Sequence, residues 1–114
     1  MISPSTYNIT CPQGATYSTT FTVSQDGVPL DLTGYTAALQ VRDSYTATDA
    51  EISLTSGSGI TLGGTAGTIA VVVSSTVTAG VAANTYVYDL ELYSGSTTTR
   101  LLQGFWKHTP EVTK

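Results

Sequence analysis

Side chains of alternating polarity recur along almost the whole chain with a period of two residues. Between Tyr17 and Ser24, the odd positions hold Tyr17, Thr19, Phe21 and Val23, whereas every even position carries serine or threonine. A period of two is that of an extended strand with one buried face, while an amphipathic helix needs a period near 3.6. The alternation returns at residues 35–41, 86–93 and 98–107. The sequence therefore predicts a fold built from β-strands.

Turn residues separate these strands. Asp26-Gly27 is a strong two-residue hairpin signal, and Pro29 directly after it indicates an edge piece because proline cannot donate to a central ladder. The polar segment 43–49 predicts a loop. Shorter strands are expected at residues 7–11, 52–54, 60–62 and 69–73. We expect the last of these to be covered on both faces, since Ala70 and Val72 are apolar as well.

A helix fits at only one place, within residues 74–83. Ser74 or Ser75 would be its N-cap. The threonine, valine and glycine there limit it to at most one short turn near residues 75–82. A chain of 114 residues is the length of one domain, so we expect a single domain over residues 1–114. Seven or eight short strands with no long helix predict an all-β fold, an antiparallel β-sandwich, with a small barrel as the alternative.

The last two strands define a hairpin register. A tight turn at Gly95-Ser96 places these residues opposite each other: Tyr93 and Thr98, Glu91 and Arg100, Leu90 and Leu101, Tyr88 and Gln103, and Tyr86 and Phe105. This register turns Tyr86, Tyr88 and the leucines of residues 86–93 inward. Asp89 and Glu91 face solvent, where Glu91 and Arg100 are expected to form a cross-strand ion pair.

The same register leaves four large side chains on the charged outer face, and these are the candidate protein-interface residues: Leu102, Trp106, Tyr93 and Val87. Exposed apolar patches commonly mark a surface for a partner. Alternatively, Trp106 covers the open end of the core.

Residues able to support catalysis or bind a metal are few. His108 is the sole histidine and is expected to be an exposed tail residue, whereas Cys11, the sole cysteine, is expected to be buried and unreactive. Asp89 and Glu91 have a spacing that glycosidases could use, but we expect them in solvent beside Arg100. The sequence therefore predicts no enzyme, no cofactor, and no catalytic, cofactor-binding or metal site.

The balance of charged residues limits the classes of partner that the chain can bind. Four Lys and Arg against eight Asp and Glu give a net charge of −4, which disfavours nucleic acid and a polybasic contact with a membrane. Charged residues make up 11% of the chain, and 12 serines and 22 threonines take their place. Such a surface suits an assembly or an extracellular setting. The residues after Met1 do not predict a signal peptide, and no apolar run is long enough to span a membrane.

Four segments of the sequence together resemble a known class of proteins. They are the segment from Gly14 to Val23, the segment Asp26-Gly-Val-Pro-Leu-Asp-Leu-Thr-Gly-Tyr-Thr-Ala, and the pair formed by residues 67–74 and 86–92. Their order is similar to that in small β-sandwich structural proteins of tailed bacteriophages, and to the N-terminal Ig-like domain of phage baseplate upper proteins. The resemblance implies an Ig-like sandwich, with Tyr86 or Tyr88 as the tyrosine of a tyrosine corner.

The resemblance also implies a function in the virion. We expect a structural protein near the tail or baseplate, an adaptor that assembles with other virion subunits as a homo-oligomer or in several copies. The chain ends near Lys114, without the helical or fibre-forming region that follows in baseplate proteins, which favours an adaptor over a tail fibre. The alternatives are capsid decoration (a cement protein) and a carbohydrate-binding module whose aromatic row would contain Tyr45, Tyr93 and Trp106.

Overall fold

Strands make up most of the fold. The computed structural model describes residues 5–112. Within that range the strands are β1 (Ser5–Thr6), β2 (Ile9–Pro12), β3 (Tyr17–Thr22), β4 (Ser24–Gln25), β5 (Val28–Pro29), β6 (Thr36–Arg42), β7 (Ile52–Ser56), β8 (Gly59–Leu62), β9 (Thr68–Val73), β10 (Asn84–Ser94) and β11 (Thr97–Thr109). One short α-helix, α1 (Ser75–Ala79), and one 3₁₀ turn, η1 (Gly64–Ala66), accompany them. The predicted all-β class is confirmed. Without the three two-residue strands β1, β4 and β5, the number of strands is eight, within the predicted seven or eight.

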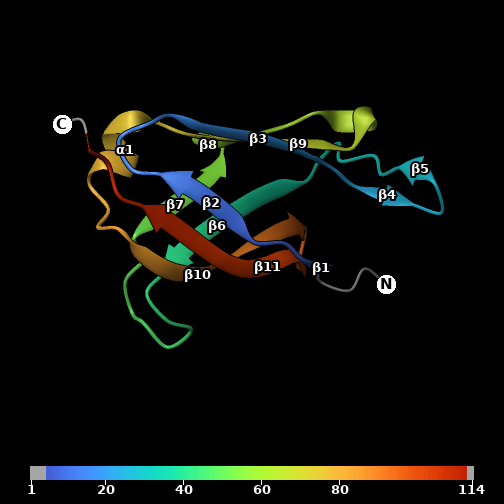
Figure 1. Cartoon of the computed structure of the whole chain (residues 1–114). Coiled ribbons are helices and arrows are strands. Elements are labelled where there is room, and N and C mark those ends of the chain that lie inside the picture. Colours follow the sequence, from blue (N-terminus) through green and yellow to red (C-terminus); the bar gives the residue numbers. More distant parts are fainter. Residues whose placement is uncertain (1–4, 113–114) are drawn as a thin grey trace.

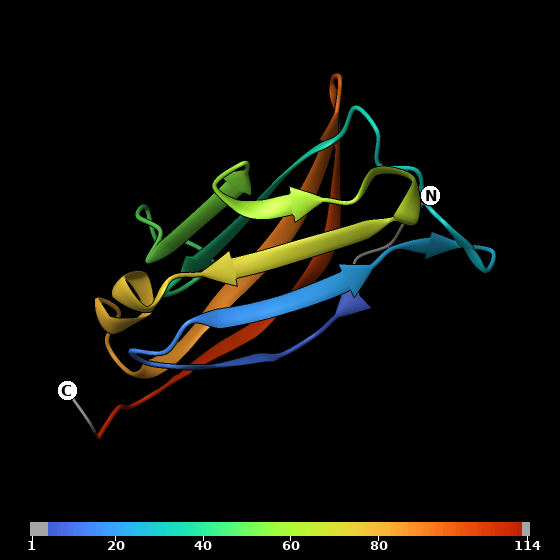
Figure 2. The ribbon, with the colours of Figure 1, turned by 90° about the horizontal axis from the view of Figure 1, so that it is seen from above.

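Nine of the strands belong to one curled sheet that forms two layers, and β4 and β5 form a separate two-stranded sheet (Figure 1). One layer contains β11, β10, β6 and β7, and the other contains β8, β9 and β3; a short parallel pairing of β7 with β8 connects them. Seen from above, the strands of the two layers cross at an angle (Figure 2). The pairs β3–β9, β6–β10 and β10–β11 correspond to those of an Ig-like sandwich. Most pairings are antiparallel, but β1 and β2 run parallel to β11.

The core lies between the inward faces of the two layers. Each long strand contributes every second residue to it, as the alternation predicts, and β10 buries Tyr86, Tyr88, Leu90 and Leu92 in turn. The largest fully buried side chains include Trp106, Leu39, Ile60 and Ile69. Burying an aliphatic side chain of this size contributes about 1.5–3 kcal/mol, so this interior is the main source of stability. Within residues 5–112, no helix is long and apolar enough to cross a membrane.

Three local predictions are confirmed. Asp26 and Gly27 both have positive φ, 52° and 78°, and join β4 to β5 as the two-residue turn that a hairpin requires. The Ser74 side chain accepts a hydrogen bond from the Val77 N–H (3.3 Å) and so caps α1. The Tyr86 hydroxyl donates to the Ala82 carbonyl (2.7 Å), which gives the fold a tyrosine corner at the start of β10.

The predicted register of the last hairpin is correct only near its turn. Tyr93 faces Thr98 and Glu91 faces Arg100, but an irregularity between Leu90 and Glu91 then shifts the pairing by one residue. Leu90 therefore faces Leu102 instead of Leu101. Such a shift is what a β-bulge produces, because one strand has an extra residue against its partner.

The shift exchanges the two faces of β11 beyond Leu101. Tyr86 faces Trp106, not Phe105, and Trp106 is 0% exposed. Phe105, which the predicted register places opposite the inward Tyr86 and therefore in the core, is 54% exposed. The prediction that Trp106 lies on the outer face is therefore wrong, because a one-residue change of register turns every following side chain to the opposite face.

One further expectation about exposure fails. β9 is not covered on both faces, because Val72 is 45% exposed while its neighbours Val71 and Val73 are buried. The outward side of β9 is therefore open to solvent at Val72.

Candidate functional site

The four predicted interface residues do not form one surface. Val87 and Tyr93 are half-buried on the side of β10 that faces away from the core, as expected. Leu102 is half-buried and packs against the core, and Trp106 lies inside it. The bulge explains the difference, since it turns the residues of β11 beyond Leu101 to the other face.

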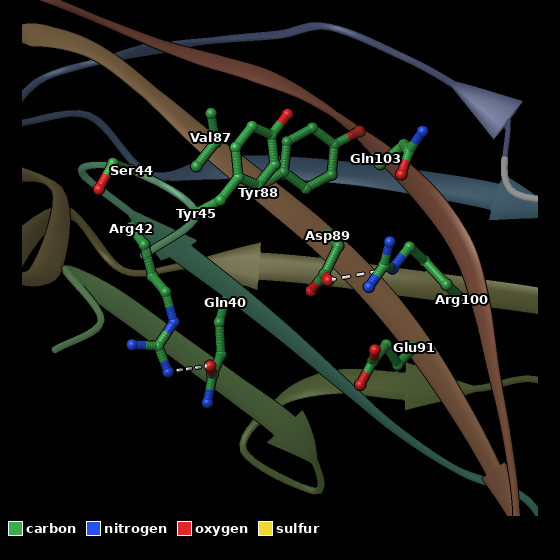
Figure 3. A pocket seen from close by; sticks show the side chains of 10 residues that line it. All are labelled: Gln40, Arg42, Ser44, Tyr45, Val87, Tyr88, Asp89, Glu91, Arg100 and Gln103. Carbon is green, nitrogen blue, oxygen red and sulfur yellow. Dashed lines mark hydrogen bonds and ion pairs between the residues drawn. The ribbon is translucent and has the colours of Figure 1, made fainter. Parts of the chain in front are cut away.

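The outward side of β6, β10 and β11 contains a hollow of about 370 Å³, which we call the β6–β10–β11 hollow. Polar side chains line most of it, and Figure 3 shows how they lie. They include Gln40, Arg42, Tyr45, Asp89, Glu91 and Arg100. Both arginines of the chain line this hollow, together with two of its eight acidic residues. The four charges sum to zero.

Hydrogen bonds hold one side of the hollow in place. The guanidinium of Arg42 donates to the Ala47 carbonyl (2.9 Å) and to Gln40 Oε1 (2.7 Å). The first bond ties the 43–50 loop, which carries Tyr45, to the end of β6. This loop extends away from the layer, on the side opposite β3, β9 and β8 (Figure 1). Tyr45 is 77% exposed.

The ion pair in the hollow is not the predicted one. Arg100 lies opposite Glu91 in the register, but its Nε is 3.4 Å from Asp89 Oδ2 (Figure 3). Glu91 Oε1 accepts a hydrogen bond from the Tyr93 hydroxyl (2.9 Å) instead. The expected Glu91–Arg100 ion pair is therefore replaced by an Asp89–Arg100 pair. Both of its members are partly exposed, so it contributes only about 0–1 kcal/mol.

The carboxyl group of Asp89 has a raised pKa. The causes are, first, desolvation by its neighbours and, second, the nearby charge of Glu91; Arg100 and Arg42 oppose them. A raised pKa in the folded state means that ionised Asp89 is disfavoured there, so it makes folding less favourable as the pH rises through that pKa.

We predict that Asp89→Asn raises the melting temperature at neutral pH and that this gain disappears at about pH 3, where Asp89 of the wild type is largely protonated in both the folded and the unfolded state. Asp31→Asn is the matched control with the opposite sign. Hydrogen bonds from the Thr33 side chain and, second, from the Thr33 N–H (2.9 Å) lower the pKa of the Asp31 carboxyl group, so their loss should reduce the melting temperature at neutral pH. Thermal unfolding followed by circular dichroism measures both. A lower melting temperature for Asp89→Asn at neutral pH would contradict this interpretation.

The two residues singled out for their reactivity are both buried. Cys11 is 0% exposed, as predicted, and burial raises the pKa of its thiol to about 11. His108 is 2% exposed, so the expectation of an exposed tail residue is wrong. Its Nδ1 accepts from the Trp106 indole N–H (3.1 Å), which places its proton on Nε2, 2.8 Å from the Thr78 carbonyl. His108 thus connects β11 to α1. Within the described range, no group of three or more His, Cys, Asp or Glu could hold a metal ion.

A second feature is the free edge of β3. This strand pairs with β9 on one side, and in the part of the chain from Ser5 to Val112 no backbone hydrogen bond joins Tyr17–Thr22 to any other strand. Its sequence, Tyr-Ser-Thr-Thr-Phe-Thr, has no charged residue and no proline. Ser18, Thr20 and Thr22 are exposed. Sequence reasoning identified β3 as a strand with a wet and a dry face, but not as an edge, because an edge depends on the pairing of distant segments.

A smaller groove of about 250 Å³ lies beside the end of β3. Phe21, Leu101 and Leu102 contribute to its lining, so Leu102, one of the predicted interface residues, is found here and not beside Tyr93.

Comparison with known proteins identifies no relative of this chain. No protein-family model matches the chain, and no curated protein matches it.

Proposed function

We propose that the chain is a virion structural protein of a tailed bacteriophage, a β-sandwich adaptor of the tail or baseplate that assembles with other virion subunits. In this proposal it is present in several copies, acts without catalysis, and contacts neither nucleic acid nor membrane. The resemblance of its turn and edge-strand phrases to phage structural proteins supports the setting. The free edge of β3 supports the mode of assembly.

The edge of β3 is the observation that carries the proposal. A free edge presents unpaired N–H and C=O groups that can extend the sheet with a strand of another chain, and proteins usually protect such edges with lysine, proline or a bulge. β3 has none of these over six residues. Its exposed side chains are hydroxyls, which suit a strand surface and offer no charge that would repel a partner. β3 is therefore the segment best suited to strand addition from a neighbouring subunit.

Thr20→Lys tests this mode of assembly. We expect the variant to fold normally, because exposed substitutions of this kind change stability by about 0.5 kcal/mol or less. Its incorporation into particles should fall about tenfold or more, since a charged side chain at the middle of the edge disfavours pairing. Thr55→Lys is the control, because Thr55 is also an exposed threonine but lies on β7, which has neighbours on both sides. The measurement is the amount of each variant in purified particles when it is supplied in trans.

Immunogold electron microscopy of purified particles tests the setting. Labelling at the tail or baseplate is the expected result. Labelling of the shell, at its three-fold or quasi-three-fold positions, would replace the tail proposal with capsid decoration. Particles without any label would contradict a function in the virion.

A further inference from the structure

The β6–β10–β11 hollow has no part in strand addition at β3, and its chemistry indicates a ligand of its own. The chain has only 12 charged residues, yet four of them meet here. A solvated sheet face would scatter these charges. Their concentration in one hollow, with Gln40 and Gln103 beside them, creates a site rich in planar polar groups.

Most of these groups keep free hydrogen-bonding capacity. A guanidinium carries five N–H donors and a carboxylate has about four acceptor positions. Arg42 uses two donors on Ala47 and Gln40, whereas Arg100 contacts Asp89 through Nε alone. Donors and acceptors therefore alternate across the hollow, Arg42 and Arg100 supplying donors and Asp89 and Glu91 supplying acceptors.

This alternation selects against ions. An anion drawn to Arg100 would approach the carboxylate of Asp89, and a cation drawn to Asp89 would approach both arginines. A neutral ligand whose groups each donate and accept a hydrogen bond meets no such conflict. Hydroxyl groups have this property, and a sugar ring presents several of them at fixed spacing.

An aromatic ring stands at the rim of the same hollow. Tyr45 is 77% exposed, on a loop that the Arg42–Ala47 hydrogen bond fixes to β6. An exposed tyrosine offers a large apolar ring face at low conformational cost, together with a polar hydroxyl. The C–H face of a pyranose can stack on such a ring while its hydroxyls reach the charged floor. A volume of about 370 Å³ lies within the range of about 300–1,000 Å³ typical of small-molecule sites.

We infer that the β6–β10–β11 hollow is a saccharide-binding site, in which Tyr45 stacks on a neutral sugar ring and Arg42, Asp89 and Arg100 bind its hydroxyls. The predicted flat row of Tyr45, Tyr93 and Trp106 is not the basis of this site, because Trp106 is buried. The fixed Arg42 and the paired Asp89 reduce the entropy lost on binding.

A glycan array probed with the full chain, followed by titration calorimetry with each glycan that binds, tests the inference. We expect wild-type protein to bind a neutral oligosaccharide, and Tyr45→Ala to weaken that binding about tenfold or more. Tyr45→Phe keeps the ring and should retain most of the affinity. Arg100→Ala should weaken binding as well, because it removes donors from the floor of the hollow.

Phe105→Ala is the matched control, since Phe105, like Tyr45, is an exposed aromatic residue but lies on β11 and does not line the hollow. It should bind as the wild type does. An array without any signal would overturn the inference, and so would binding that is unchanged in both Tyr45→Ala and Arg100→Ala. Thr20→Lys should leave glycan binding intact, so the failure of strand addition at β3 and the failure of this site can be distinguished.

Discussion

Replacing Trp106 by alanine should destabilise the isolated protein by about 3–5 kcal/mol, the range typical of truncating a large buried aromatic. Trp106 is fully buried, and its ring makes edge contacts with Tyr17 and Tyr88 at centroid distances of 5.5 and 6.1 Å. The substitution also leaves Nδ1 of buried His108 without its donor. A domain of this size has a free energy of unfolding of only about 5–15 kcal/mol, so the variant should be close to unfolding at ambient temperature.

The neighbouring residue supplies the control for this experiment. Phe105→Ala truncates an aromatic ring one position away on the same strand, but that ring is 54% exposed, so we expect a loss of about 1 kcal/mol or less. Urea unfolding followed by far-UV circular dichroism measures both variants without depending on the fluorescence of the single tryptophan. Equal losses for the two variants, or a larger loss for Phe105→Ala, would restore the register in which Trp106 faces outward.

These two residues also show where sequence reasoning failed. The alternation in residues 86–93 predicts correctly which of its side chains are buried, because the extra residue of the bulge, Leu101, lies in β11 and leaves the alternation of β10 intact. In β11 the adjacent leucines Leu101 and Leu102 point to opposite faces of the strand. Either register therefore places one leucine on the inward face, and the sequence does not distinguish the two. The structure uses both, with Leu101 buried and Leu102 packed against the core. The outward Trp106 that the simple register required was itself a sign that the register was incomplete.

The turns and caps were predictable for a different reason. Asp26-Gly27, the Ser74 cap and the Tyr86 corner depend on interactions within a few residues, and local chemistry determines those. The β6–β10–β11 hollow depends instead on three strands and a loop. Asp89 and Glu91 were recognised as neighbours on one face, but Arg42 and Tyr45 were not connected with them, because no periodicity indicates how β6 aligns with β10. The free edge of β3 was unpredictable on the same grounds.

The substitution Gly67→Ala should be strongly destabilising although it changes no side chain of the hydrophobic core, at a cost of about 2–5 kcal/mol. Gly67 has a φ of 70°, and a Cβ built there would lie 2.7 Å from the Val23 carbonyl oxygen, 3.0 Å from the Leu30 carbonyl oxygen and 3.1 Å from the Leu30 nitrogen. These are backbone atoms that cannot rotate away as a side chain would. They are also tied together, because the Val23 N–H donates to the Gly67 carbonyl and the Leu30 N–H to the Val23 carbonyl.

Gly27→Ala separates the two contributions to this cost. Gly27 has a similar φ of 78°, but nothing lies within 4 Å of a Cβ built there, so its substitution should cost only the backbone strain, about 1–2 kcal/mol. The difference between the variants in chemical unfolding then measures the close approach of three backbone segments at Gly67. That approach anchors the β4–β5 hairpin to the sandwich. Equal losses of the free energy of unfolding in the two variants would mean that the hairpin can move away at no cost. Gly67 would then be required only for the positive φ of its own turn.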